Sequence, residues 1–191
     1  MSAALQFQSE RERVYARLAE KPFVTPNHEW LACIIASWCA GQSVLPDYLG
    51  LEAVQFNALT EQYFPGCPLP GQAPSGCQLD FGRMLEKEDM VNLLSQFSKP
   101  ESFENEWVIA ILVAACLGSD HLWQDLGLWS RAQLSALLHY NFPALAAKND
   151  KDMKWKKFLY KQLCEAEGLY LCRAPSCGVC IDYPKCYGAE D

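Results

Sequence analysis

The sequence predicts an all-α fold, in which a single helical domain is followed by an irregular, cysteine-rich C-terminal segment. Apolar residues recur at helical spacing along most of the chain, and no stretch alternates apolar and polar residues over the length of a strand. Four of the ten cysteines lie within the last 20 residues. Because 191 residues, 50% of them hydrophobic, suit one globular unit, we expect a helical domain over residues 1–168. We expect residues 169–191 to form a C-terminal segment that packs on this domain or extends from it.

The first half of the chain predicts three helices and a loop. Residues 7–20 repeat apolar side chains at helical spacing before Pro22 closes the segment. Asn27 is the expected N-cap of a second helix that ends near Gly41, and its apolar circumference predicts a place at the centre of the core. A third helix is expected over 51–64, whereas the repeated Pro and Gly of 65–76 predict a loop.

The second half predicts four more helices. We expect helices over 83–97 and 102–117, the latter almost wholly apolar after Glu106. Ser130 and Gln133 form a capping box for a short helix that Pro143 limits. The final helix is expected over 152–167, and it leads directly to the cysteine-rich segment. Its predicted core face consists of Trp155, Phe158, Leu159, Leu163 and Ala166.

Charge and apolar run lengths exclude several classes of protein. The net charge of −7 disfavours binding to nucleic acid or to anionic lipid. The longest apolar runs are well short of the roughly 20 residues that cross a bilayer, and no apolar stretch of signal-peptide length follows the N-terminus. We therefore expect a cytoplasmic protein that neither spans a membrane nor binds nucleic acid, and whose thiols are reduced.

The C-terminal cysteines are spaced to surround an inorganic group. They read C-x4-C-x2-C-x5-C at Cys172, Cys177, Cys180 and Cys186. The two-residue gap lets two sulfurs face one centre, and the longer gaps, each at most about 20 Å of extended chain, reach around an object larger than one ion. The first three positions match plant-type iron-sulfur ligation, whereas a zinc site more typically has two close pairs. The spacing favours an iron-sulfur or mixed-metal site at these four residues, with zinc as the alternative.

Three segments of the sequence resemble the NifQ family, whose members donate molybdenum during assembly of the nitrogenase iron-molybdenum cofactor. The segments are the four-cysteine motif, MKWKKFLYKQLCEAEG at 153–168 and HLWQDLGLWSRAQL at 121–134. The resemblance covers the last 70 residues, and the N-terminal 100 residues carry no motif of their own.

The resemblance implies a carrier and not an enzyme. It implies that Cys172, Cys177, Cys180 and Cys186 bind an iron-sulfur cluster, of 3Fe-4S or 4Fe-4S type, together with molybdenum as a Mo-Fe-S unit. Molybdenum would pass to the scaffold NifEN, with the nitrogenase iron protein NifH taking part. Storage of the metal and capture of molybdate require different groups. Soft thiolates hold iron and thiophilic metals, whereas molybdate is a hard oxyanion that needs positive charge.

Positive charge is concentrated beside the cysteines. Residues 151–186 carry +3, while the remainder of the chain carries −10. We expect cations of the Lys151–Lys161 stretch, in particular Lys154, Lys156 and Lys157, to guide molybdate to the cluster, unless they form only the solvated face of the last helix. His121 is the histidine to test as a molybdenum ligand, against the alternative of a helix-end residue bonded to backbone.

The remaining motifs and cysteines do not point to catalysis or to a second metal site. The chain has no G-x-S-x-G elbow, phosphate loop, H-E-x-x-H or dinucleotide fingerprint, so an enzyme is not expected. An iron-sulfur electron carrier and a zinc-stabilised interaction domain are the alternatives to a molybdenum donor. The remaining cysteines are expected to be small buried hydrophobes or loop residues: Cys33, Cys39, Cys67, Cys77, Cys116 and Cys164.

Overall fold

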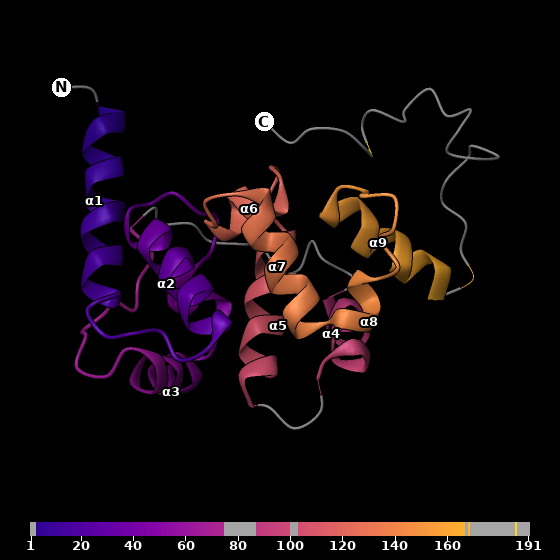
Figure 1. Ribbon diagram of the computed structural model, residues 1–191, viewed down its shortest axis with the longest axis horizontal. Helices are drawn as coiled ribbons and strands as arrows, with labels where there is room; N and C mark the ends of the chain where they lie inside the picture. Colours follow the sequence, from indigo (N-terminus) through magenta and orange to yellow (C-terminus); the bar gives the residue numbers. More distant parts are fainter. Residues whose placement is uncertain (1–2, 75–86, 100–102, 167, 169–185, 187–191) are drawn as a thin grey trace.

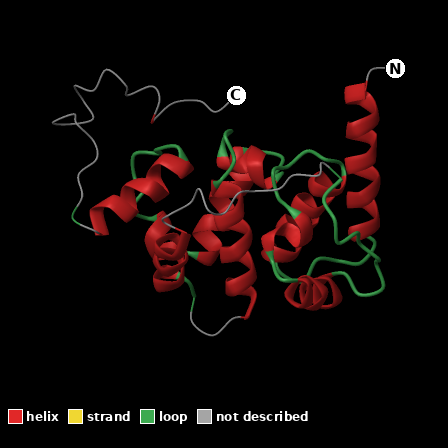
Figure 2. Ribbon diagram, turned by 180° about the vertical axis from the view of Figure 1, so that it is seen from behind, coloured by secondary structure: helices red, strands yellow, loops and turns green. Residues whose placement is uncertain are grey.

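The computed structural model describes residues 3–74, 87–99, 103–166, 168 and 186, and these residues form helices joined by loops. Viewed from behind, the described part of the chain shows helices and loops, with no strand (Figure 2). The all-α class is therefore confirmed for these residues. Cys172, Cys177 and Cys180 lie outside the described residues.

The N-terminal half places three helices side by side. In Figure 1, α1 runs along one edge of the molecule next to α2, and α3 lies across the lower end of both. A short 3-10 turn, η1, follows α2, and its left-handed residues Tyr48 and Leu49 turn the chain toward α3. The bounds are α1 Ala3–Leu18, α2 Pro26–Cys39, η1 Asp47–Gly50 and α3 Ala53–Tyr63.

The second half forms a bundle around α5, and it ends with α9 at the side of the molecule opposite α1 (Figure 1). Two of its elements, α6 and α8, are too short to show helical periodicity, and the sequence did not predict them. Pro143 does not merely limit α7 but begins α8, as a proline at the first helical position can. The bounds are α4 Lys87–Phe97, α5 Phe103–Cys116, α6 Leu122–Leu126, α7 Arg131–Asn141, α8 Pro143–Ala146 and α9 Trp155–Ala166.

The core centres on α2 and α5, as their apolar circumference predicts. Every residue from Trp30 to Trp38 is buried, and so is the run from Ile111 to Cys116. The Trp38 indole N–H donates to the Pro46 carbonyl at 3.1 Å, which satisfies a polar group inside the core. Helix α5 contacts η1 and α3 as well as α4 and α6, so it links the N-terminal elements to the helices that lead to the cysteine-rich segment.

The cap of α2 differs from the sequence prediction. Thr25, not Asn27, is the N-cap: its hydroxyl accepts from the His28 N–H at 3.3 Å, and Pro26 is the first helical residue. Asn27 is buried inside the helix instead. Its side-chain amide exchanges two hydrogen bonds with that of Asn141 on α7, at 2.9 and 2.8 Å. This residue therefore joins α2 to α7.

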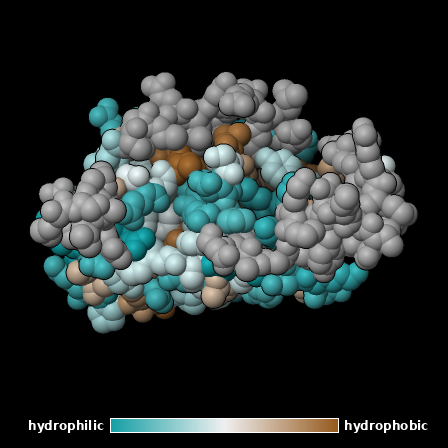
Figure 3. Space-filling model, turned by 90° about the horizontal axis from the view of Figure 1, so that it is seen from above, coloured by the Kyte–Doolittle hydropathy of each residue, from teal (hydrophilic) through white to brown (hydrophobic). Residues whose placement is uncertain are grey.

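The described surface carries little exposed apolar area. On the face shown in Figure 3, most of the described surface is hydrophilic or intermediate in hydropathy, and strongly hydrophobic colour is confined to a few patches. Val24 and Val54 are the large hydrophobic side chains that stand exposed among the described residues. No helix in the described part of the chain has both the length and the apolar character required to cross a bilayer.

Candidate metal centre

Cys186 is the one cysteine of the C-terminal motif among the described residues, and it lies against the helical domain. Its side chain is half-buried and packs on the hydrophobic core. Its carbonyl accepts from the Lys154 N–H at 2.8 Å, directly before the first residue of α9. The Lys154 carbonyl in turn accepts from the Phe158 N–H at 2.9 Å, as an N-cap carbonyl does. Cys186 is thus docked at the N-terminal end of α9.

Several polar contacts hold this end of α9. Asn149 and Met153 exchange two hydrogen bonds, of 2.8 and 2.9 Å, across the turn before the helix. The Arg131 guanidinium donates to the Asp152 carboxylate at 2.9 Å. The Trp155 indole N–H donates to the Ser135 hydroxyl of α7 at 2.9 Å. The chain that receives Cys186 is therefore fixed on α7 before α9 begins.

A buried ion pair adds a further attachment, to α6. The Lys156 ammonium forms an ion pair with the Asp125 carboxylate and donates to the Gly118 carbonyl at 2.9 Å. Asp125 is 1% exposed and the Lys156 side chain 17%. Burial raises the pKa of the Asp125 carboxyl above its ordinary value, and the hydrogen bond from Lys156 opposes that shift. Lys156 is therefore a structural cation, which corrects the expectation that it helps to guide molybdate.

The neighbouring lysines keep their charge at the surface. Lys154, directly before α9, is partly exposed, and Lys157, in the first turn of α9, is exposed. Lys161, one turn further on, forms an ion pair with Glu165 at 3.5 Å. The core face of α9 is as predicted for Trp155, Phe158, Leu159 and Leu163, whereas Ala166 is exposed because the helix ends there.

The histidines occupy structural positions. His121 precedes α6, and its backbone N–H donates to the Gln124 side-chain carbonyl at 3.2 Å. His28 is buried against the rings of Phe23, Tyr63 and Phe64, and this burial lowers the pKa of its imidazole. His139 contacts the Ser135 carbonyl through Nδ1 at 2.8 Å. Among the described residues, no three His, Cys, Asp or Glu side chains are grouped to hold a metal ion.

Three cysteines outside the motif are poor metal ligands because their thiols resist ionisation. Burial raises the pKa of Cys33 and of Cys39 to about 11 and that of Cys116 to about 12. The thiolate is the form that binds metal. Cys33 and Cys116 are buried as expected, whereas Cys39, Cys67 and Cys164 are half-buried. Cys77 lies outside the described residues.

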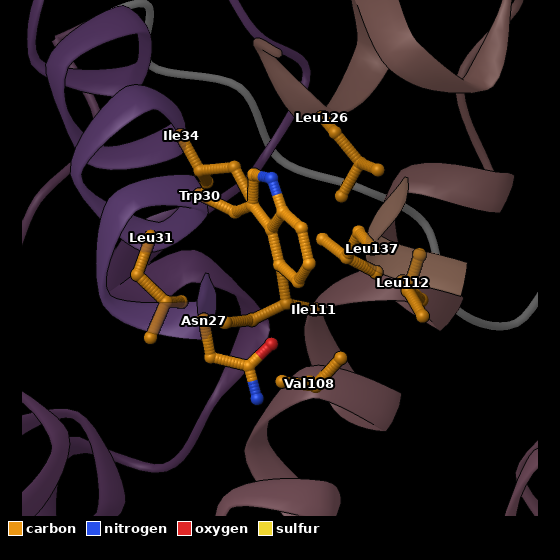
Figure 4. A pocket seen from close by; sticks show the side chains of 9 residues that line it. All are labelled: Asn27, Trp30, Leu31, Ile34, Val108, Ile111, Leu112, Leu126 and Leu137. Atoms are coloured by element: carbon orange, nitrogen blue, oxygen red, sulfur yellow. The ribbon is translucent and has the colours of Figure 1, made fainter. Parts of the chain in front are cut away.

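One cavity between the described helices is too small for a ligand. A cavity between α2 and helices α5, α6 and α7 has a volume of about 10 Å³, at the lower limit for one water molecule. Figure 4 shows its apolar lining, with Asn27 at one edge. The Asn27 amide is already bonded to Asn141. This cavity is therefore a packing defect and not a binding site.

Comparisons with known proteins agree on one family. The NifQ family model matches residues 30–188, a range that contains all four motif cysteines and extends far beyond the last 70 residues. Protein NifQ of Azotobacter vinelandii is 43% identical over 176 residues, which are 86% of this chain and 89% of that relative. Protein NifQ homolog of Sinorhizobium fredii is 51% identical over 161 residues, 80% of this chain and 66% of the relative. Protein NifQ of Klebsiella pneumoniae is 32% identical over 168 residues, 85% and 99% of the two chains. No solved structure matches the chain.

Proposed function

The chain belongs to the NifQ family, and from this premise we propose that it serves nitrogen fixation by acquiring molybdenum and donating it for assembly of the nitrogenase iron-molybdenum cofactor. In this proposal it is a carrier and not an enzyme. It holds the metal on an iron-sulfur cluster, of 3Fe-4S or 4Fe-4S type, as a Mo-Fe-S unit. It delivers molybdenum to the scaffold NifEN, with the nitrogenase iron protein NifH taking part.

The observation that supports the proposal is the position of the last motif cysteine. Cys186 is a half-buried free thiol docked at the start of α9, so one donor of the set has a fixed place on the folded domain. Cys180 is six residues earlier, which limits its distance from Cys186 to about 20 Å of chain. Cys172 and Cys177 complete a set of four soft donors, which are the donors that iron-sulfur clusters and thiophilic metals require.

The charge beside Cys186 fits an anionic cargo. Lys154 lies directly before α9 and Lys157 in its first turn, and the N-terminal end of the helix adds the positive end of its dipole. A tetrathiolate cluster is negatively charged, and molybdate is an oxyanion. Both are attracted by this electropositive turn in a chain that is acidic overall. We propose that Lys154 and Lys157 form the approach for molybdate.

Substitution of the two lysines tests the approach. We expect the K154Q/K157Q variant to load molybdenum severalfold more slowly from molybdate at low salt while its iron content stays unchanged. K161Q is the matched control, because Lys161 already pairs with Glu165. The difference should disappear near 1 M salt, where the screening length is about 3 Å. Equal molybdenum loading in both variants at low salt would contradict the role of these lysines.

Metal analysis of anaerobically prepared protein separates the alternative functions. Iron together with molybdenum is the result that the proposal predicts. Iron without molybdenum, with reversible redox chemistry, would instead indicate an electron carrier. Zinc in a colourless protein that unfolds on chelation would indicate an interaction domain.

A further inference from the structure

The position of Cys186 depends on the position of the start of α9. The hydrogen bond from the Lys154 N–H to the Cys186 carbonyl, 2.8 Å long, is the polar contact that connects Cys186 to the helical domain among the described residues. Whatever fixes the depth and rotation of the first turn of α9 therefore fixes Cys186.

The contacts that hold this turn differ in how strictly they define its position. Trp155, Phe158 and Leu159 are buried, but apolar contacts weaken gradually when a helix shifts. The bond from Trp155 to Ser135 links neutral groups. The ion pair of Lys156 with Asp125 is different, because Asp125 is buried and an unpaired buried charge costs about 3–5 kcal/mol. A displacement of α9 that separates the pair therefore meets a steep penalty.

The site of attachment adds a second restraint on the same ammonium group. Lys156 donates to the Gly118 carbonyl at 2.9 Å as well as to Asp125, so one acceptor on the α5–α6 connection and one on α6 hold the same Nζ atom. Gly118 lies directly against the Asp125 carboxylate: a Cβ on Gly118 would be 2.6 Å from Oδ2. The three groups thus form a compact unit between α6 and α9.

We propose that Asp125 and Lys156 are positioning residues for the metal centre: they fix the first turn of α9 and thereby the place at which the Cys186 thiolate meets its cargo. The inference rests on the proposed function only in treating Cys186 as a ligand. Neither Asp125 nor Lys156 touches the metal. Their effect on loading is transmitted through the backbone from Lys156 to Lys154 and across one hydrogen bond to Cys186.

The metal-free wild-type chain allows a test that does not depend on loading. Hydrogen exchange of the Lys154 amide reports its bond to Cys186, and the alkylation rate of Cys186, followed by peptide mass spectrometry, reports exposure of the thiol. The test variant is D125N/K156M, which removes both charges together, because replacing both partners of a buried pair usually preserves folding. We expect exchange at Lys154 and alkylation of Cys186 to be about tenfold faster than in the wild type.

Controls separate positioning from general stability. L59A opens a cavity on α3, far from α9, and should lower the free energy of unfolding by about 2–5 kcal/mol without accelerating either local reaction under native conditions. K156R keeps a cation at the position and should restore slow exchange. If D125N/K156M does not fold, D125N/K156Q, which also removes both charges and keeps a hydrogen-bond donor at position 156, provides the same comparison.

Two results would overturn the positioning role. One is a D125N/K156M or D125N/K156Q chain in which the Lys154 amide and the Cys186 thiol react at wild-type rates. The other is an L59A chain that shows the same acceleration as the test variant. Because these rates are measured without metal, they remain decisive even if wild-type protein binds neither iron nor molybdenum, a result that would refute the proposed function separately.

Discussion

Adding one methyl group at Gly118 should be among the more damaging small substitutions in this domain. A Cβ there would lie 2.6 Å from Oδ2 of Asp125 and closer still to Cγ, well inside van der Waals contact. Asp125 is buried and has no room to withdraw. The methyl group must therefore displace the carboxylate from Lys156. Overpacking alone costs about 1–3 kcal/mol, and separation of a buried ion pair costs about 3–5 kcal/mol.

We expect G118A to lower the free energy of unfolding of the metal-free chain by about 3 kcal/mol or more, measured by equilibrium urea denaturation with tryptophan fluorescence. G41A is the control, because Gly41 has φ +69° and no atom within 4 Å of an added Cβ. Its cost should be only the left-handed strain, about 1–2 kcal/mol.

A double-mutant cycle assigns the cost to the contact with Asp125. In a D125A/K156M background the carboxylate is gone and the methyl group has space, so G118A should then cost less than about 1 kcal/mol. The reasoning fails if G118A costs less than about 1 kcal/mol in the wild-type chain, or if its cost is the same in both backgrounds.

Two further predictions concern pH and the domain boundary. Burial lowers the pKa of His28 in the folded chain, so the unfolded state binds the proton more strongly, and the free energy of unfolding should fall as pH decreases below about 6.5. H28F cannot take up that proton, so urea midpoints at pH 7 and pH 5 should differ less in this variant than in the wild type; an equal difference would exclude His28 as the cause. A chain ending at Gly168 loses the bond from Lys154 to Cys186, worth about 1 kcal/mol, and should remain helical and unfold cooperatively by circular dichroism. Loss of cooperative unfolding would show that residues 169–191 belong to the core.

Helical periodicity predicted the long helices because each of them buries an apolar face. The apolar circumference of α2 and α5 correctly placed both in the core. The short helices α6 and α8 were not predicted, because four or five residues do not establish a helical period. The predicted N-cap of α2 was wrong because Thr25 and Asn27 are both good capping residues. Pro26, favoured at the first helical position, was the available signal for Thr25.

In the candidate site too, features set by local sequence could be predicted, and features set by contacts between distant residues could not. The spacing of the motif cysteines is local, so the sequence predicts them as ligands, and this role stays a prediction. The structure places Cys186 beside the start of α9. The role of Lys156 was not accessible, because a lysine on an amphipathic helix resembles a solvated residue. Its partner Asp125 is 31 positions earlier in the chain. Only the packing of α9 on α6 brings the two together.

The most direct test of the account is the iron and molybdenum content of protein prepared without oxygen and supplied with both elements. The wild-type chain is predicted to carry both. A chain with serine at Cys172, Cys177, Cys180 and Cys186 should lose both while its helical circular dichroism is unchanged. A wild-type chain with neither element, or a serine variant that keeps both at wild-type levels, would contradict the assignment of this protein as a molybdenum carrier built on its C-terminal cysteines.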